Sequence, residues 1–434
     1  MSMPESKIKT KNEKIKESLA RTKTRRKEQV TRVIQLKIDY GRLSKAKKDA
    51  LNLAYASAKH LYNDAIKSND IWSYKPPSTV RVTLPDNTME NRDIVLGSQI
   101  KQGIVNQAKD NIKSLSTLRK HGYKTGALKP VHQIDSLPLN QKNVTYKLNK
   151  RHNRVKIQKI PGWLRLVGYD RLENWDEYGP AKLIRNPDGY YLAVTVFMDK
   201  TEYQAMRAAQ AALHNIMVQG PRGYDAGSRV LLADDEGGVF NKEYPSHTRK
   251  AKYWSRRMSK RYDPGARKNT DLQSQGYVKA QRAYRKELLR TSREKTAVAR
   301  EYVYYDLLKH DEIFLQDEQF ASWKKRRSCF NMSLRMDASI VPRMYALYKI
   351  HEAQVTVLDK WQPTTRWCPV CGRRTPCPVT QRVFVCEYCG YSMERDTHGA
   401  QNMIRLGRRP LSYEELRKPR DVPVGPFMGI SKQA

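Results

Sequence analysis

The chain has 434 residues, of which 39% are hydrophobic, so it can bury sizeable cores and is not wholly disordered. Its 82 Lys and Arg against 44 Asp and Glu give a formal charge of +38, which favours a polyanionic partner, above all a nucleic acid. The polar N-terminus excludes a secretion signal, and no apolar run reaches membrane-spanning length, so we expect a soluble intracellular protein without membrane contact.

The first part of the chain is predicted to be mainly helical. Residues 1–30 are basic and polar, and we interpret them as a flexible tail. A strand is predicted at 32–39, "RVIQLKID". Apolar residues then recur every three or four positions from Leu43, with either Leu53 or Ala54 at one buried position, which predicts a long helix. Helical periodicity resumes at 98–120, so the pattern indicates a helical insert after one strand.

The segment between 130 and 200 changes to short runs typical of strands. "VTYKL", "RVKIQKI", "WLRLVG" and "YYLAVTVF" are separated by polar, Gly and Pro residues. These runs predict an antiparallel sheet or a small barrel.

A second module is predicted to begin near residue 216. The stretch 223–240, "GYDAGSRVLLADDEGGVF", reads as a strand and a hairpin with its turn at 234–238. Residues 249–310 are strongly basic and helical, with tyrosines and a tryptophan among the arginines. This mixture suits phosphate pairing and stacking on bases, although a solvated helix face accounts for part of the charge.

Two cysteine pairs predict a structural metal site. "CPVC" at 368–371 and "CEYC" at 386–389 are each followed by Gly. Two such knuckles supply four thiolates to one tetrahedral Zn²⁺ and leave no open position for a substrate water. The predicted ligands are Cys368, Cys371, Cys386 and Cys389, and we interpret Cys377 between them as a spectator.

Three acids are candidates for binding Mg²⁺. Ions of this kind prefer carboxylate oxygens that converge from separate elements. Asp225 lies in the strand "GYDAG", whose small neighbours leave room for a metal and a phosphate, and Asp396 begins the helical pattern "ERDTHGAQNMIRLG". The third acid is expected from "IFLQDE" at 313–318. His398 has no evident partner and is interpreted as solvated.

In combination and order, these motifs resemble TnpB-type transposon-encoded RNA-guided nucleases and the related miniature type V CRISPR effectors. The motifs that carry the resemblance are "LYNDAI", "GYDAGSRVLLADDEGG", "IFLQDEQF", "QPTTRWCPVCG" and "VCEYCGYSMERDTHGAQNM". It implies an α+β multidomain protein in which an RNase H-like (RuvC) nuclease domain contains a zinc ribbon and follows an N-terminal wedge β-barrel with a helical recognition insert.

The resemblance and the residue patterns together give a domain organisation. It comprises a basic flexible tail 1–30, a wedge-like β-barrel 31–40 and 126–215, a helical recognition module 41–125, a RuvC-like core 216–362 with the basic helical segment 249–310, a zinc ribbon 363–392, a final RuvC helix 393–410 and a loosely ordered tail 411–434.

The middle acid departs from the commonest family pattern, in which Glu-Asp-Leu follows an apolar triplet. That alignment places Gln316 where the Glu is expected. Side chains alternate across a strand, so Gln316 and Glu318 share one face while Asp317 lies on the other. We therefore predict Glu318 as the metal ligand; Asp317 or an inactive site are the alternatives.

The resemblance implies an RNA-guided DNA endonuclease. Its partners would be a guide RNA and a double-stranded DNA target chosen by pairing and a short flanking motif. As a hypothesis, Asp225 bridges two Mg²⁺ ions while Glu318 and Asp396 each complete one coordination shell. The alternative is an RNA-guided DNA-binding repressor without nuclease activity, and an unguided transposase fits less well. The expected setting is the cytoplasm of a prokaryote, with either a cellular or a phage gene, and the expected state is a monomer or homodimer.

Overall fold

The computed structural model describes residues 11–83, 88–120, 122, 124–227, 230–240, 248–266, 273–318, 320, 340–351, 354–378 and 380–428. The chain divides into two compact units. The N-terminal unit comprises Met1–Tyr203 and Lys250–Lys286, and the C-terminal unit comprises Gln204–Arg249 and Glu287–Ala434. Among the helices in these described ranges, none combines the length and the apolarity needed to cross a membrane.

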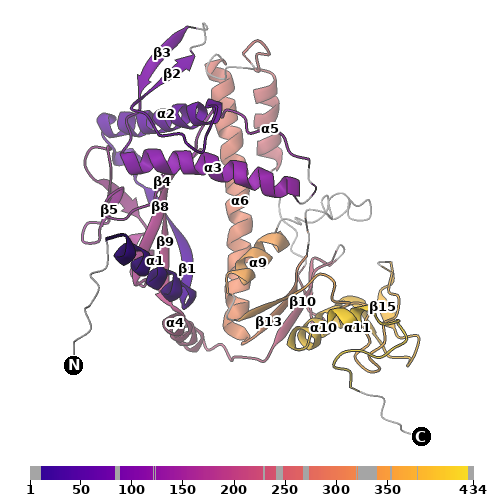
Figure 1. Cartoon of the computed structure of the whole chain (residues 1–434). Coiled ribbons are helices and arrows are strands. Elements are labelled where there is room, and N and C mark those ends of the chain that lie inside the picture. Colours follow the sequence, from indigo (N-terminus) through magenta and orange to yellow (C-terminus); the bar gives the residue numbers. More distant parts are fainter. Residues whose placement is uncertain are drawn as a thin grey trace, which may run out of the picture. The chain divides into compact units, whose positions relative to one another are not determined.

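A seven-stranded antiparallel sheet forms the core of the N-terminal unit. In spatial order its strands are β4 (Ser136–Leu139), β8 (Glu177–Asn186), β9 (Gly189–Asp199), β1 (Gln29–Ile38), β7 (Leu164–Val167), β6 (Arg154–Ile157) and β5 (Tyr146–Asn149). The register of β8 against β9 shifts between Tyr178 and Ala181, and an irregularity of this kind bends a strand. The sheet curls into a nearly closed, barrel-like form (Figure 1).

A helical insert lies between β1 and β4. Its elements are the short 3-10 helix η1 (Tyr40–Arg42), α2 (Lys45–Lys67), the hairpin β2 (Thr79–Thr83) and β3 (Met89–Asp93), and α3 (Ser98–Lys120). Leu61 of α2 packs in one core with Ile104 of α3. Leu53 is 48% exposed and Ala54 is buried, so Ala54 is the buried residue of the two that the periodicity allowed. The Tyr55 hydroxyl donates a hydrogen bond to the carbonyl of Leu183, at 2.8 Å, and so attaches α2 to β8.

The basic N-terminal segment is helical, which corrects the expectation of a flexible tail over residues 11–27. These residues form α1 (Lys11–Lys27), a run without Gly or Pro that favours a helix. Arg26 forms an ion pair with Glu177 at 2.9 Å and lies over the ring of Phe197 at 3.3 Å. The end of α1 is therefore attached to the sheet by charge and by stacking.

The C-terminal unit contains a five-stranded mixed sheet. Its strands in spatial order are β12 (Val239–Phe240), β11 (Leu232–Asp234), β10 (Arg222–Asp225), β13 (Ile313–Gln316) and β14 (Val355–Leu358). The first three strands are antiparallel neighbours, whereas β10, β13 and β14 run parallel to one another. The carboxyl ends of β10 and β13 therefore meet at the same edge of the sheet.

Helices cover both faces of this mixed sheet. Leu315 packs in a core with residues of α6 (Gln275–Lys309) and α9 (Ile340–Lys349), including Val303 and Met344. Phe314 points to the other face and packs with Met403 of α10 (Arg395–Arg408). Alternation along β13 thus separates two cores, as expected for a parallel strand that is buried on both faces.

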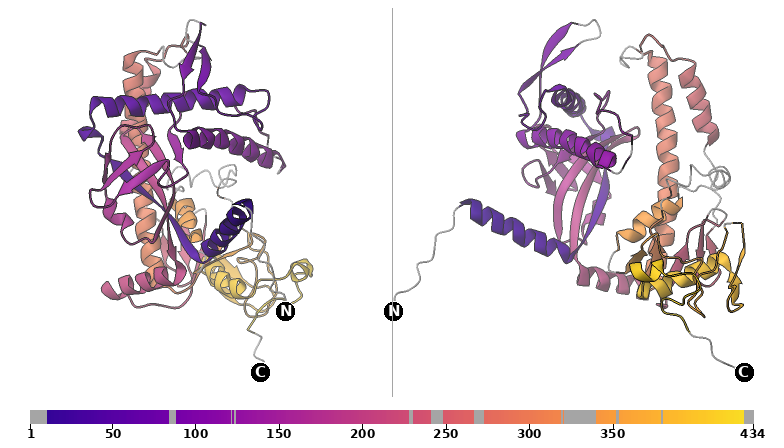
Figure 2. Two further views of the ribbon diagram at one scale, coloured as in Figure 1. Left: turned by 60° about the vertical axis from the view of Figure 1, so that its left-hand side comes forward. Right: turned by 45° about the vertical axis from the view of Figure 1, so that its right-hand side comes forward.

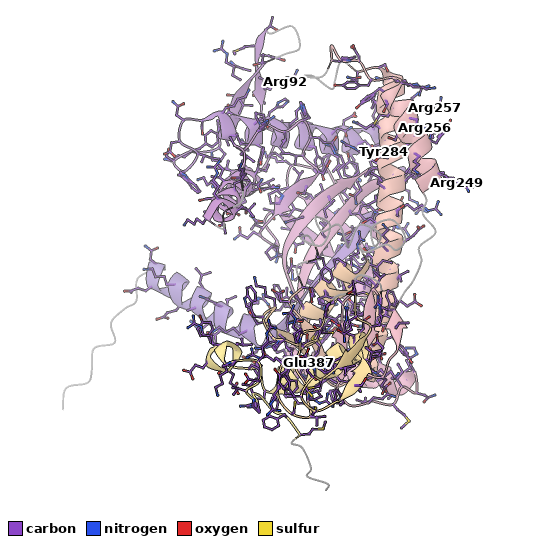
Figure 3. All side chains as sticks on the ribbon, turned by 90° about the vertical axis from the view of Figure 1, so that its right-hand side faces the viewer. Arg92, Arg249, Arg256, Arg257, Tyr284 and Glu387 are labelled. Carbon is purple, nitrogen blue, oxygen red and sulfur yellow. The ribbon has the colours of Figure 1, made fainter. Side chains whose placement is uncertain are left out.

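The described residues of the basic segment 249–310 are mostly helical, as the sequence predicts. They include α5 (Thr248–Ser259) and α6, and α5 lies beside the first part of α6 (Figures 1 and 2). On α5, Arg257 stacks over the rings of Tyr253 and Trp254, with the guanidinium 5.5 and 5.6 Å from the ring centres. Figure 3 labels Arg256 and Arg257 on this helix, and Arg256 is exposed. Helix α5 therefore carries cationic and aromatic side chains next to one another.

The segment after α10 is folded rather than loosely ordered over residues 411–428, which corrects the prediction for this tail. It contains α11 (Tyr413–Arg417), which begins with a capping box formed by Ser412 and Glu415. The Trp367 indole N–H donates to the carbonyl of Val424 at 2.8 Å, and Leu411 and Val424 are both buried in its core. The side chain of Trp367, which comes just before the cysteine knuckles, therefore gives the apolar residues of this segment a core to join.

We expect a chain that ends at Arg409 to have a free energy of unfolding lower by about 3 kcal/mol or more, because it exposes Trp367 and removes two buried aliphatic side chains. A chain that ends at Met428 keeps these contacts and is the matched control. Chemical denaturation of both truncations measures the difference. Equal stability of the two chains would contradict the packing role of residues 410–428.

Candidate functional site

The first cysteine knuckle precedes a short hairpin, and the second forms the loop of that hairpin. Cys368 and Cys371 precede it, and Cys386 and Cys389 follow β15 (Val383–Val385) before the chain enters β16 (Ser392–Glu394). The glycines after the knuckles, Gly372 and Gly390, have φ values of 71° and 73°. Glycine adopts this left-handed conformation without steric cost, so each knuckle can close on itself.

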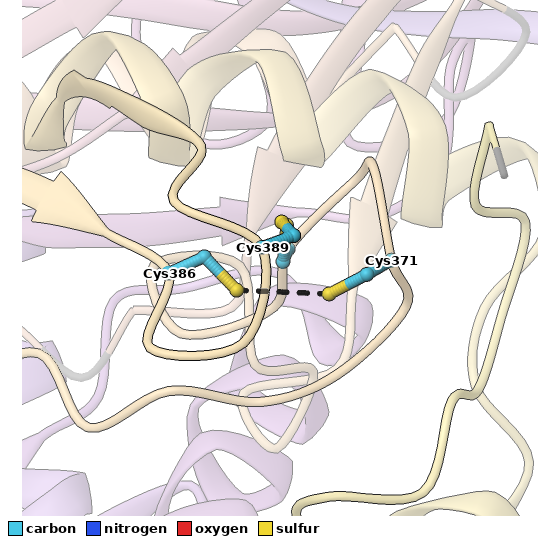
Figure 4. A group of neighbouring side chains, drawn as sticks. Cys371, Cys386 and Cys389 are labelled. Atoms are coloured by element: carbon cyan, nitrogen blue, oxygen red, sulfur yellow. Dashed lines mark hydrogen bonds between the residues drawn. The ribbon is translucent and has the colours of Figure 1, made fainter. Parts of the chain in front are cut away.

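The four thiols converge on one point. All four Sγ atoms lie within 4.8 Å of one another, and the Cys368–Cys389 and Cys371–Cys386 pairs are each separated by 3.6 Å. Figure 4 shows Cys371, Cys386 and Cys389 directed toward each other. Tetrahedral zinc with Zn–S bonds of about 2.3 Å requires S···S separations of about 3.8 Å. The cluster therefore has the size that could hold Zn²⁺.

Two thiols of the cluster have pKa values that are shifted in opposite directions. Burial raises the pKa of Cys371 to about 11. Burial acts in the same direction on Cys386, but backbone N–H groups of Tyr388 and Cys389 and the hydroxyl of Thr375 outweigh it and lower that pKa to about 7. A bound divalent cation offsets the cost of burying several thiolates.

Cys377 lies outside the cluster. It is buried with Phe384 and the knuckle cysteines, but its thiol is not one of the four converging ligand atoms. Burial raises its pKa, and this favours the neutral thiol. Cys377 is therefore a packed neighbour in this arrangement.

We expect Cys371→Ser to lose bound zinc and to loosen the ribbon, because a structural site needs all four thiolates. Cys377→Ser removes a buried thiol of the same size outside the cluster, and this control should retain about one zinc per chain. Elemental analysis of freshly purified protein measures both. Equal zinc content in the two variants would contradict the ligand assignment.

The first acid, Asp225, lies at the carboxyl end of β10 and faces α10. A Cβ atom at Gly399 of α10 would lie 2.7 Å from Oδ2 of Asp225, and a Cβ atom at Gly223 would collide with the carbonyl oxygen of Ala400. The two glycines thus allow the helix backbone to approach the strand directly. Asp225 is buried, and burial followed by the charges of Asp396 and Glu318 raises its pKa well above the usual value.

The second acid, Asp396, lies in the first turn of α10. Glu394 caps this helix, because its carboxylate accepts a hydrogen bond from the N–H of Thr397 at 2.7 Å. The buried Asp396 carboxylate forms ion pairs with Arg395 at 2.9 Å and with Arg382 at 3.4 Å. These two arginines were not singled out from the sequence, and they hold the carboxylate in a defined orientation.

The residues around the third acid have different environments. Gln316 is buried, and its amide nitrogen donates to the carbonyls of Asp359 at 3.1 Å and Gln362 at 2.8 Å. Its amide oxygen accepts a hydrogen bond from the Thr364 hydroxyl at 3.0 Å. Both N–H groups of this amide and one lone pair of its oxygen are thus used, and they hold the loop after β14.

Asp317 and Glu318 lie beyond the end of β13. Asp317 is exposed and pairs with Lys349 at 2.7 Å. Glu318 is half-buried. Burial is the main cause of the raised pKa of Asp225 and of Tyr345, and the charge of Glu318 acts in the same direction on both, after that of Asp396 in the case of Asp225. Glu318 is therefore the residue of this pair that interacts with Asp225. Alternation in the strand ends at Gln316, where the N–H of Glu318 turns back to the Gln316 carbonyl at 2.9 Å.

The acids are spaced more widely than the thiols. Within the described residues, the four cysteines are the only group of three or more His, Cys, Asp or Glu residues whose ligand atoms all lie within 4.8 Å of one another. Two ions that are about 3.5–4 Å apart require a wider set of ligands than a single ion does. The three carboxylates supply hard oxygen donors of the type that Mg²⁺ prefers.

His398 is buried, so its interpretation as a solvated residue is wrong. Its ring stacks on Phe384 with centres 4.0 Å apart, and its Nε2 lies 3.0 Å from the amide nitrogen of Asn402. Burial lowers its pKa to about 4, followed by the charge of Arg405. The spacing of His398, Asn402 and Leu406 on one helix face is the signal that could have revealed this burial.

We expect Gln316→Glu to lower the free energy of unfolding by about 1–3 kcal/mol, because a carboxylate would face two backbone carbonyls that now accept hydrogen bonds. Restoring the usual family residue would therefore weaken the protein. Glu312→Gln, an exchange of similar size at an exposed position, is the control. Denaturant titration measures both variants, and a Gln316→Glu protein as stable as the parent would contradict this role.

Residues 343–403 match the family model described as Cas12f1-like, TNB domain. A search of curated proteins found no significant match. This family match confirms the resemblance to TnpB-type and miniature type V effector proteins.

Two solved structures are similar to this chain at low sequence identity. The cryo-EM structure of the Cas12f1-sgRNA-target DNA complex has 12% identity and a TM-score of 0.35, and the match covers 70% of each chain. The structure of the mini-RNA-guided endonuclease CRISPR-Cas_phi3 has 10% identity and a TM-score of 0.44, and the match covers 97% of this chain and 99% of that one.

Proposed function

We propose that this protein is an RNA-guided DNA endonuclease whose catalytic acids are Asp225, Glu318 and Asp396. The observation that carries the proposal is the placement of the acids: Asp225 ends β10, Glu318 follows the parallel strand β13, and Asp396 lies in the first turn of α10, which packs on β10 through Gly399 and Gly223. An RNase H-like (RuvC) domain implies this arrangement. One acid lies on the central strand, one follows the parallel neighbouring strand, and one lies on the helix that packs across both.

The donor set fits magnesium. Asp225, Glu318 and Asp396 would hold the ions, and two bound Mg²⁺ ions would activate a water and stabilise the charge on the leaving oxygen. Asp225 is poised for this role, because its burial beside two acids disfavours its charged form until a cation is present. Arg382 and Arg395 orient Asp396 and keep its charge compensated.

The remaining parts of the chain suit a nucleic-acid complex. The charge of +38 and the arginine and aromatic side chains of α5 favour a guide RNA and a double-stranded DNA target. We propose that the curled seven-stranded sheet and its helical insert correspond to the wedge barrel and recognition module. The match of residues 343–403 to a Cas12f1-like domain supports the proposed function for the C-terminal unit only.

The alternative function, an RNA-guided repressor without nuclease activity, was suggested by Gln316. The hydrogen bonds of Gln316 give that residue a structural role, and Glu318 supplies a carboxylate that interacts with Asp225. These contacts favour the active enzyme. Magnesium-dependent cleavage of a plasmid that matches the cognate RNA separates the two functions.

We expect Glu318→Ala to lower the cleavage rate at least about 100-fold, because it removes a metal ligand, while guide RNA binding stays unchanged. Asp225→Ala should have the same effect. Asp317→Ala removes the neighbouring, surface-paired acid and should retain the parental rate. Plasmid cleavage and RNA retention by each purified complex measure the two properties.

The comparison of the adjacent acids is the decisive control. Full activity of Glu318→Ala together with inactivity of Asp317→Ala would transfer the role to Asp317. Full activity of both variants would remove this segment from the catalytic site. Inactivity of the parent with its cognate RNA and Mg²⁺ would favour the repressor.

A further inference from the structure

One buried hydroxyl group near the proposed catalytic acids lacks a hydrogen bond. Tyr345 lies on α9, is 3% exposed and packs in the core that α6 and α9 form with the mixed sheet. Within the described part of the chain, its hydroxyl has no hydrogen-bond partner. Burying a hydroxyl without a partner costs stability, and a phenylalanine would fill this position without that cost. Packing alone therefore does not explain why the residue is a tyrosine.

The other tyrosines buried in this core do have partners. The hydroxyls of Tyr224 and Tyr348 both donate to the carboxylate of Asp306, at 2.6 and 2.8 Å. Tyr348 follows Tyr345 by three residues on α9, so the two side chains are neighbours on the surface of the same helix. The same core thus satisfies one of these two hydroxyls and leaves the other without a bond.

The Tyr345 hydroxyl lies close to two of the acids. Its ring packs edge to face with that of Phe320, with centres 5.0 Å apart, and Phe320 comes two residues after Glu318. Ala226, which follows Asp225 directly, belongs to the same core as Tyr345. Burial is the main cause of the raised pKa of Tyr345, and the charges of Glu318 and then Asp225 act in the same direction. Packing and electrostatics therefore agree on the position of this hydroxyl.

The direction of the Glu318 side chain is not set by its strand. β13 ends at Gln316, and the N–H of Glu318 turns back to the Gln316 carbonyl at 2.9 Å. The two residues before Glu318 are held elsewhere, Gln316 by the loop after β14 and Asp317 by Lys349. Carboxylates that bind metals usually accept a hydrogen bond from an outer residue, which fixes their orientation.

We propose that Tyr345 is a positioning residue for Glu318, and that its hydroxyl donates a hydrogen bond to the Glu318 carboxylate when that carboxylate binds Mg²⁺. A phenolic O–H suits this role, because an ionised carboxylate only accepts hydrogen bonds. The new bond would also offset the cost of burying the hydroxyl. This inference rests on the proposed nuclease function and deepens it, because it concerns Glu318 as a metal ligand.

The test measures Mg²⁺ binding separately from cleavage, with full-length protein purified free of RNA. A metal that binds the folded state raises the thermal unfolding midpoint. We expect Tyr345→Phe to need about ten-fold more Mg²⁺ than the parent for the same rise, because an outer hydrogen bond to a metal ligand contributes on this scale to metal affinity. Asp225→Ala, which removes a proposed ligand, gives the background response. In buffer without Mg²⁺, Tyr345→Phe should unfold at or above the parental midpoint.

The matched control is Tyr348→Phe, which makes the same chemical change on the same helix but removes a hydroxyl bonded to Asp306. This control should lower the unfolding midpoint without Mg²⁺ and keep the parental dependence on Mg²⁺. Plasmid cleavage by the complex with guide RNA is a second measurement. Tyr345→Phe should cleave more slowly than the parent at limiting Mg²⁺ and recover most of the rate at saturating Mg²⁺.

A parental Mg²⁺ requirement in Tyr345→Phe would overturn the inference and leave the nuclease function intact. A midpoint below that of the parent without Mg²⁺ would also overturn it, since the hydroxyl would then have a partner in the fold. Identical responses of the parent and Asp225→Ala would instead refute the metal site and the proposed function together. A weakened Mg²⁺ response of Tyr345→Phe in a protein that never cleaves would support the role of Tyr345 and refute the nuclease function.

Discussion

The arrangement of the C-terminal unit depends on a close approach between one helix and one strand. Gly223 on β10 and Gly399 on α10 lack the Cβ atoms that would hold the two backbones apart. This contact places the first turn of α10, with Asp396, beside the end of β10, with Asp225. A larger side chain at Gly223 would meet backbone, which cannot rotate away, whereas one at Gly399 would meet a carboxylate.

The close approach has an electrostatic consequence. Asp225 is buried next to two other carboxylates, and like charges in a poorly solvated place repel strongly. The protein moderates this repulsion in part with Arg382 and Arg395, which form ion pairs with Asp396. Among the described residues Asp225 forms no ion pair with an arginine, although the charge of Arg395 opposes the rise of its pKa, so a bound cation would stabilise its charged form.

Local patterns in the sequence predicted some features well. The cysteine spacing and the glycine after each knuckle are local, and the thiols converge as these patterns require. Alternation along β13 correctly separates Phe314 from Leu315. The same alternation could not predict the direction of the Glu318 side chain. The strand ends at Gln316, and this direction then depends on the following turn.

Other features depend on contacts that are distant in the sequence. The order of the strands in the mixed sheet places β10 beside β13 across almost ninety intervening residues, which no local pattern specifies. Residues 411–428 contain several Pro and charged residues, and they fold because Trp367, which lies outside them, gives Leu411 and Val424 a core to join. The basic segment 11–27 lacks an apolar face, so its attachment to Glu177 could not be predicted from periodicity.

The stacking of Phe384 on His398 connects the zinc ribbon to the helix that carries Asp396. The connection is also covalent, because β16 ends at Glu394, the residue whose carboxylate caps that helix. The free energy of metal binding in such a ribbon is largely folding free energy. Zinc binding at the four thiols would therefore be thermodynamically linked to the order of Asp396, and by reciprocity whatever stabilises the first turn of α10 would also strengthen zinc binding by the ribbon.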